Sequence, residues 1–137
     1  MDIIQWKDEY NTNIPIIDQH HRKMASMIND FYSSVKSNEN NLHIKKTLDA
    51  LIDYTKYHFA YEEMLFEKFD YNEKIGHVKA HIDLKGKIIE YREKIESSTV
   101  VSHSEVLGFL IDWFISHITK MDTKYVTFFA EKNIEVK

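Results

Sequence analysis

Two pairs of side chains that could bind a metal ion have the same spacing in the sequence. His58 and Glu62 are four residues apart in the stretch HFAYE, and His77 and His81 are four residues apart in HVKAH. Residues at this spacing lie about 6 Å apart along an α-helix and about 40° apart around it, so both side chains can reach one point. Imidazole and carboxylate groups are ligands for iron, zinc and manganese. The spacing therefore indicates metal binding from two helices.

Two further histidines, His20 and His21, are adjacent in the stretch IIDQHHRKM. Neighbouring side chains on a helix point about 100° apart, so only one of them can be central to a buried face. Helical spacing selects His21, which falls in step with the apolar residues Ile17, Met24, Ile28, Phe31 and Val35. His20 then lies about 80° from the centre of that face. We therefore expect His21 to face the core.

The apolar periodicity predicts four helices, over residues 18–36, 42–69, 74–96 and 103–132, with Asp18 as the N-cap of the first. Residues 1–17 are expected to form an extended arm that carries Trp6. Only three glycines and one proline occur, which disfavours a turn-rich β fold. The sequence therefore predicts one all-α domain over residues 1–137, an antiparallel up-down-up-down four-helix bundle.

Polar residues interrupt the predicted buried faces of all four helices. They are His21, His58, Glu62, His77, His81 and His117. A single core histidine is more often a hydrogen-bonded structural residue than a ligand. Six such groups need a common partner, because an unpaired buried imidazole or carboxylate is costly. Antiparallel packing brings them to one end of the bundle, so a bound cation is the simplest partner. Beyond His117 the buried face is expected to continue through Met121, Tyr125 and Phe128.

The number of ligands favours two metal ions over one. Five histidines are too many for one ion that keeps an open coordination position, and bridging carboxylates are typical of two ions about 3.5–4 Å apart. The Glu-x-x-His pairs of ferritin-like di-iron proteins are not found, because no glutamate precedes any of the eight histidines by three residues. This counts against the carboxylate-rich class that activates oxygen.

Composition excludes several other functions. The net charge is −4 and the only basic cluster is a doublet, Lys45-Lys46, so we expect no nucleic-acid partner. No apolar stretch approaches the length of a membrane span, and the first residues do not have the form of a signal peptide. We therefore expect a cytoplasmic protein with no membrane partner. The absence of cysteine rules out thiolate ligands and disulfides.

Four stretches together resemble the hemerythrin family, in particular its single-domain bacterial members. They are IDQHHRKMASMIN, HFAYEE, the H-x-x-x-H of His77 and His81, and WFISHITKMD. The arm with Trp6 also resembles that family, so the similarity covers nearly the whole chain. In this alignment His21, not His20, takes the place of the ligand, in agreement with the helical spacing.

The resemblance implies two non-haem iron ions with an oxo or hydroxo bridge. His77, His81 and His117 would hold one ion, His21 and His58 the other, and Glu62 and Asp122 would bridge both. Asp122 enters only through the resemblance. It lies five residues after His117, about 140° around a regular helix, so a local distortion of the helix must bring it inward.

The function implied is reversible binding of O2, as a carrier, store or sensor, and not an enzymatic activity. A sensor role would need a protein partner. One alternative is a di-iron enzyme that reduces peroxide or nitric oxide or oxidises iron. A third hypothesis is a structural bundle that holds zinc or no metal.

The chain departs from the family pattern at two positions. His20 stands where the family commonly has glutamine, and it could contact a ligand, lie on the surface or compete as a ligand. Phe114 stands where leucine is common and would line the O2 pocket. Phe59, Trp113 and Ile118 are further pocket candidates, although plain core packing explains each equally well. His43 and His103, at predicted helix starts, are expected at the surface.

Overall fold

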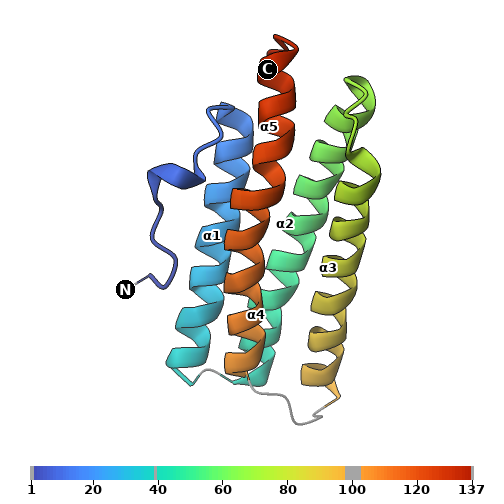
Figure 1. The fold of residues 1–137 in the computed structure, drawn as a ribbon. Helices are drawn as coiled ribbons and strands as arrows, with labels where there is room; N and C mark the ends of the chain where they lie inside the picture. Colours follow the sequence, from blue (N-terminus) through green and yellow to red (C-terminus); the bar gives the residue numbers. More distant parts are fainter. Residues whose placement is uncertain (1, 39, 98–102, 137) are drawn as a thin grey trace.

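The protein is a bundle of four long helical rods in a computed structural model that describes residues 2–38, 40–97 and 103–136. The first three rods are α1 (Pro15–Lys36), α2 (Asn41–Lys68) and α3 (Lys74–Glu96). The fourth is made of α4 (His103–Ser116), a π-helical segment η2 (His117–Met121) and α5 (Asp122–Glu131). These residues contain no strand, which confirms the predicted all-α bundle (Figure 1). None of these helices has both the length and the apolar character needed to cross a membrane.

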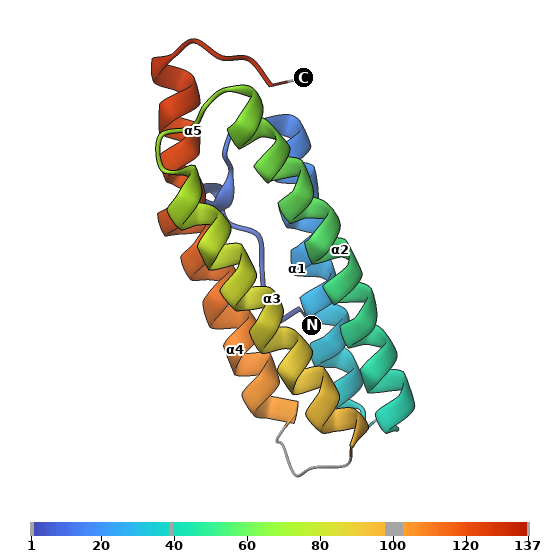
Figure 2. The same cartoon turned by 90° about the vertical axis from the view of Figure 1, so that its right-hand side faces the viewer.

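The rods are antiparallel neighbours. α1 packs against α2 and α4, and α2 packs against α3 (Figures 1 and 2). The start of α1, the end of α2 and the start of α3 therefore lie at the same end of the bundle, together with α5. This arrangement brings histidines that are distant in the sequence to similar heights.

The first helix begins three residues earlier than predicted. Pro15 occupies its first turn and Ile14 is the N-cap, because a proline at this position has no N–H to leave unpaired and a φ that suits a helix. The prediction that Asp18 caps the helix was wrong. Its carboxylate instead accepts hydrogen bonds from the backbone N–H groups of Thr12 at 2.7 Å and Asn13 at 3.2 Å. Asp18 thus fixes the turn that leads into α1.

The ends of α1 and α2 are each followed by a residue with a left-handed backbone, and so is the end of α5, at Asn133. Asn38 follows α1 with φ of 53°, and Asp70 follows α2 with φ of 50°. Asparagine and aspartate tolerate this conformation better than other residues that have a side chain. After Asp70, the N–H of Tyr71 donates to the carbonyl of Phe66 at 2.9 Å. Tight turns of this kind explain how the chain connects long helices with so few glycines.

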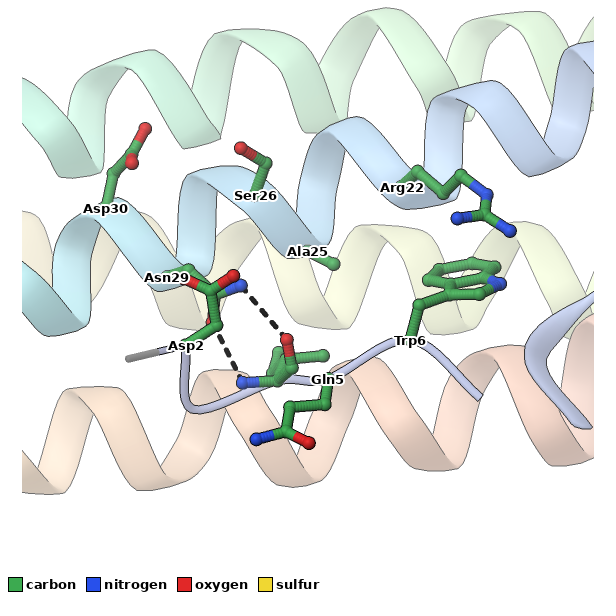
Figure 3. A pocket seen from close by; sticks show the side chains of 9 residues that line it. Asp2, Gln5, Trp6, Arg22, Ala25, Ser26, Asn29 and Asp30 are labelled. Atoms are coloured by element: carbon green, nitrogen blue, oxygen red, sulfur yellow. Dashed lines mark hydrogen bonds between the residues drawn. The ribbon is translucent and has the colours of Figure 1, made fainter. Parts of the chain in front are cut away.

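The arm before α1 is bound to the bundle by specific contacts. Asn29 accepts a hydrogen bond from the N–H of Ile4 at 2.8 Å and donates one to its carbonyl at 3.0 Å. The guanidinium of Arg22 lies over the ring of Trp6, 4.5 Å from its centre (Figure 3). Tyr10, in the short 3-10 helix η1 (Asp8–Tyr10), is buried. The arm therefore covers part of the outer face of α1.

The apolar core has two parts. The larger contains Met24, Ile28, Leu48, Phe59, Leu84, Phe114 and Ile118, among others. The smaller contains Ile17, Leu65, Phe66, Tyr71, Tyr125 and Phe129. In the sequence, the polar residues lie where one part gives way to the other: His21 between Ile17 and Met24, Glu62 between Phe59 and Leu65, and His77 and His81 between Tyr71 and Leu84. The core of the bundle is thus divided by a polar layer near the connection between α2 and α3.

The fourth rod changes its helical repeat at the polar layer. In η2 the backbone N–H of Asp122 donates to the carbonyl of His117, five residues earlier, as in a π-helix. Asp122 is buried as a result, whereas Met121 is partly exposed. The prediction that Met121 and Phe128 continue the buried face was wrong. The π turn contains one extra residue and moves the inward positions on to Asp122 and Phe129.

Deletion of one residue tests this interpretation. Removing the exposed Lys120 should convert η2 into regular α-helix and leave the residues after it on their present faces, because the deletion cancels the extra residue. We expect a folded bundle whose free energy of unfolding, measured in urea, changes little. Removing the exposed Glu90 from the regular helix α3 is the matched control. It should rotate Tyr91 and Ile95 away from the core and destabilise the fold strongly. Equal losses from the two deletions would contradict this account.

Candidate metal centre

Seven polar side chains form the layer between the two apolar parts of the core. They are His21, His58, Glu62, His77, His81, His117 and Asp122, and none exposes more than 5% of its surface. α1 supplies one of them, α2 two, α3 two, and the fourth rod two at the ends of its π turn. The structure thus brings together all seven residues that the sequence analysis singled out as ligands.

The seven residues fall into two groups that share a carboxylate. In one group, potential ligand atoms of His77, His81, His117 and Glu62 lie within 4.8 Å of one another. In the other, those of His21, His58, Glu62 and Asp122 do so. Each group has the donor types that suit a transition metal ion. The shared Glu62 places the two candidate metal positions next to each other.

Both carboxylates face histidines of the two groups. Oδ1 of Asp122 is 3.1 Å from Nε2 of His77 and 3.1 Å from Nε2 of His117, while Oδ2 is 3.0 Å from Nε2 of His21. The two oxygens of this one side chain therefore face different groups.

Glu62 joins the groups in a different way. Its Oε1 atom is 3.3 Å from Nε2 of His58 and 3.3 Å from Nε2 of His81. Glu62 and Asp122 thus have the positions that two bridging carboxylates would need.

Several atoms of the layer are buried and make no hydrogen bond of normal geometry in the described part of the chain, although some of them face one another at the distances given above. These atoms are both oxygens of Glu62, both oxygens of Asp122, both ring nitrogens of His21 and Nε2 of His81. Leaving buried polar atoms unpaired costs free energy, and such atoms call for an explanation. Metal ions held between them would satisfy nitrogen and oxygen lone pairs at once. The donor set and its unpaired atoms therefore fit a metal centre.

The ionisation of the two carboxylates also supports a metal centre. Burial would raise the pKa of Asp122, but His117, His21 and His77 outweigh burial and hold it well below its usual value. Burial and the charge of Asp122 raise the pKa of Glu62, yet His58 and His81 bring it below its ordinary range. Both carboxylates are therefore ionised at neutral pH. Two buried negative charges favour the binding of cations.

His20 occupies a position that the sequence analysis left open. It is only 3% exposed, and its Nδ1 atom lies 2.8 Å from Nδ1 of His58. Burial, followed by the proximity of His58 and His21, lowers the pKa of His20 to about 4, so the ring is neutral at neutral pH. Both members of the histidine doublet are thus buried. His21 faces the centre of the bundle, and His20 faces α2, which covers the side of α1 about 80° away.

Glu63 is a contact that the sequence analysis missed. Its Oε2 atom lies 3.1 Å from Nδ1 of His81, on the side of the ring opposite to the centre. The signal was present in the sequence, since Glu63 is the second glutamate of HFAYEE. Glu63 directly follows the inward-facing Glu62, so helical spacing alone places it about 100° away from the buried face and predicts a side chain exposed to solvent.

Aromatic rings cover the layer, but they do not all lie on the same side. Phe114 lies 6.4 Å from His21 with its ring almost perpendicular. Phe59 stacks on His81 at 3.7 Å, and Trp113 stacks on His117 at 5.3 Å. Trp113 also lines a groove between α3 and α4 with Leu84, Phe109 and Met121. Of the four pocket candidates, Phe114 lies beside the group of His21, and Ile118 is buried in the larger part of the core.

The two remaining histidines lie outside the layer. His43 is exposed in the first turn of α2, where its N–H donates to the side chain of the N-cap Asn40 at 2.9 Å. His103 is partly exposed at the start of α4. Neither belongs to the two groups of candidate ligands.

Comparison with known proteins identifies the family. The model of the Hemerythrin HHE cation binding domain matches residues 12–129. The chain belongs to the hemerythrin family. This range contains all seven side chains of the polar layer. The resemblance found in the sequence motifs is confirmed.

Other hemerythrins are similar along most of their length. Bacteriohemerythrin of Pseudomonas aeruginosa is 34% identical over 121 residues, which are 88% of this chain and 78% of that protein. Bacteriohemerythrin of Methylococcus capsulatus is 31% identical over 117 residues, covering 85% and 88% of the two chains. The crystal structure of wild-type hemerythrin superposes with a TM-score of 0.85 at 29% identity, covering 91% of this chain and 96% of that one. A single-residue variant of hemerythrin gives a TM-score of 0.87 at 30% identity, covering 93% and 97%.

Proposed function

We propose that this hemerythrin binds O2 reversibly at a pair of non-haem iron ions with an oxo or hydroxo bridge. The observation that carries the proposal is the pair of ligand groups that share Glu62, with Asp122 facing both. An iron pair held in this way would supply electrons to O2 on binding and recover them on release. The names of the relatives, bacteriohemerythrin and hemerythrin, support the same assignment.

The residues would divide unequally between the two ions. His77, His81 and His117 would hold one ion, while His21 and His58 would hold the other. Glu62 and Asp122 would bridge them. The end with two histidines has one protein ligand fewer, so a position is left there for O2. In this proposal, Phe114 lines that position because its ring packs against His21.

The surroundings of the centre would favour reversible binding of O2 over irreversible oxidation of the iron ions. The ligand side chains are at most 5% exposed, and apolar rings pack against them. Excluding water prevents side reactions such as loss of a reactive bound species. Imidazoles bind metal ions in the neutral form, so five of them together with two carboxylates would give the ligand set a charge of about −2, which would partly offset two divalent ions.

Metal analysis tests the ligand assignment. The purified protein should contain two iron ions per chain. His21→Ala should empty one position, because it removes one of only two histidines at that end. His43→Ala is the matched control and should keep both ions, since His43 is exposed outside the layer. Iron measured by atomic absorption against protein concentration decides between these outcomes. Equal iron in the two variants would contradict the assignment.

Optical spectra with and without O2 test the proposed function itself. The reduced protein should develop charge-transfer bands when O2 is added and lose them when O2 is removed, over repeated cycles. Irreversible oxidation during the first exposure would contradict reversible binding. Sustained consumption of O2, peroxide or nitric oxide with a supplied reductant would instead establish an enzyme.

The size of residue 114 should control access to the centre. Phe114→Leu removes ring atoms beside His21 and opens space in a tightly packed core. We expect O2 to bind a few times faster and the oxygenated protein to autoxidise faster, as followed by stopped-flow absorbance. Phe109→Leu is the control, because Phe109 lies on the same helix next to Tyr91, away from His21. Unchanged rates in the Phe114 variant would exclude this role.

A further inference from the structure

The contact between His20 and His58 constrains where the protons of both rings lie. Their Nδ1 atoms are 2.8 Å apart, with the ring planes at 81°. One of these nitrogens must therefore carry a hydrogen and the other must offer a lone pair. Nε2 of His58 points the other way, to Oε1 of Glu62 at 3.3 Å, within the group of candidate ligands.

Metal binding by His58 fixes the direction of this hydrogen bond. A nitrogen that binds a metal uses its lone pair, so a neutral His58 ring that binds through Nε2 must carry its hydrogen on Nδ1. His58 is then the donor and His20 the acceptor. His20 in turn carries its own hydrogen on Nε2.

His81 provides an independent comparison within the same site. Its Nε2 atom is also 3.3 Å from Oε1 of Glu62, and its Nδ1 atom faces Oε2 of Glu63 at 3.1 Å. An ionised carboxylate can only accept a hydrogen bond, so the direction is set there by the chemistry of the partner. His58 and His81 thus have the same arrangement about Glu62. The Nδ1 atom of His58 faces an imidazole, that of His20, whereas the Nδ1 atom of His81 faces a carboxylate, that of Glu63.

The surroundings of His20 hold its ring in place. Tyr54, Tyr57 and Tyr61 of α2 pack around it, with ring centres 5.9, 5.3 and 5.1 Å away. The ring is 3% exposed and does not belong to either group of candidate ligands. His20 is therefore kept beside His58 without being aimed into the metal centre.

We propose that His20 is a positioning residue: by accepting the Nδ1 hydrogen of His58, it presents the Nε2 lone pair of His58 to the metal. This inference rests on the proposed metal binding and adds to it a residue that helical periodicity had placed away from the site. Groups that orient metal-binding histidines typically change metal affinity by about 10- to 100-fold when they are removed.

The experiment compares His20→Gln with His20→Leu in the full chain loaded with Zn²⁺, a diamagnetic probe. Glutamine retains a carbonyl oxygen that can accept from His58, whereas leucine has similar bulk and no acceptor. The affinity for each ion is measured by competition with a chelator. His20→Leu should weaken the binding of one of the two ions by about 10- to 100-fold, and His20→Gln should restore it to near the wild-type value. His43→Leu controls for the loss of a histidine elsewhere.

A spectroscopic measurement separates positioning from general packing. Nitrogen-15 NMR of the histidine side chains in the zinc-loaded protein should show the hydrogen of His58 on Nδ1, hydrogen-bonded in wild type and in His20→Gln. In His20→Leu, the signal should move to that of an N–H without a partner. If this variant does not fold, His20→Ala replaces it in both measurements.

The outcomes distinguish this inference from the proposed function. Wild-type protein that binds neither zinc nor iron would overturn both. Normal binding in wild type, with equal affinities in the glutamine and leucine variants, would overturn only the role of His20. A hydrogen found on Nε2 of His58 in the zinc-loaded protein would overturn the role of His20 and would also remove His58 from the proposed set of ligands.

Discussion

The burial of two carboxylates and five imidazoles in one layer of an apolar bundle is the constraint on which the rest of the structure depends. Charged and polar groups lose their hydration when they are buried, and the loss must be offset by partners inside the protein. Here the partners come from all four rods, and several oxygen and nitrogen atoms still have no hydrogen-bond partner in the described part of the chain. The layer thus has the composition of a ligand set, and the helices must have heights and rotations that bring its seven side chains together.

The two sides of the layer are supported differently. Behind His81 lies the carboxylate of Glu63, and behind His58 lies the imidazole of His20. A carboxylate that accepts the N–H of a ligand histidine makes the other ring nitrogen more basic, and so a stronger electron-pair donor to the metal, than a neutral acceptor does. Together with the unequal number of histidines, this difference would make the two metal positions chemically distinct. Under the function proposed above, this asymmetry would favour the binding of O2 at one of the two ions.

The π turn brings His117 and Asp122 to the same side of the fourth rod. His117 and Asp122 must both face the layer, although a separation of five residues places them about 140° apart on a regular helix. Hydrogen bonding from Asp122 to the carbonyl five residues earlier closes a wider turn that brings both residues to the same side. The change is confined to one turn, and α5 beyond it buries Tyr125 and Phe129 in the smaller part of the core. The local distortion thus turns two candidate ligands to the same side without a break in the rod.

Helical periodicity in the sequence was enough to predict the four-helix class, the inward faces of the first three rods and six of the seven candidate ligands, because each follows from a period of 3.6 residues. The motif HITKMD pointed to Asp122 only through its family resemblance. Two further features, the inward position of Asp122 and the burial of His20, became evident only from the three-dimensional structure. The shift from Met121 to Asp122 depends on the backbone hydrogen bonding of the π turn, which a regular period of 3.6 residues does not include. The burial of His20 depends on α2 covering the side of α1, since the periodicity of one helix describes its own faces and not the neighbours that pack on them.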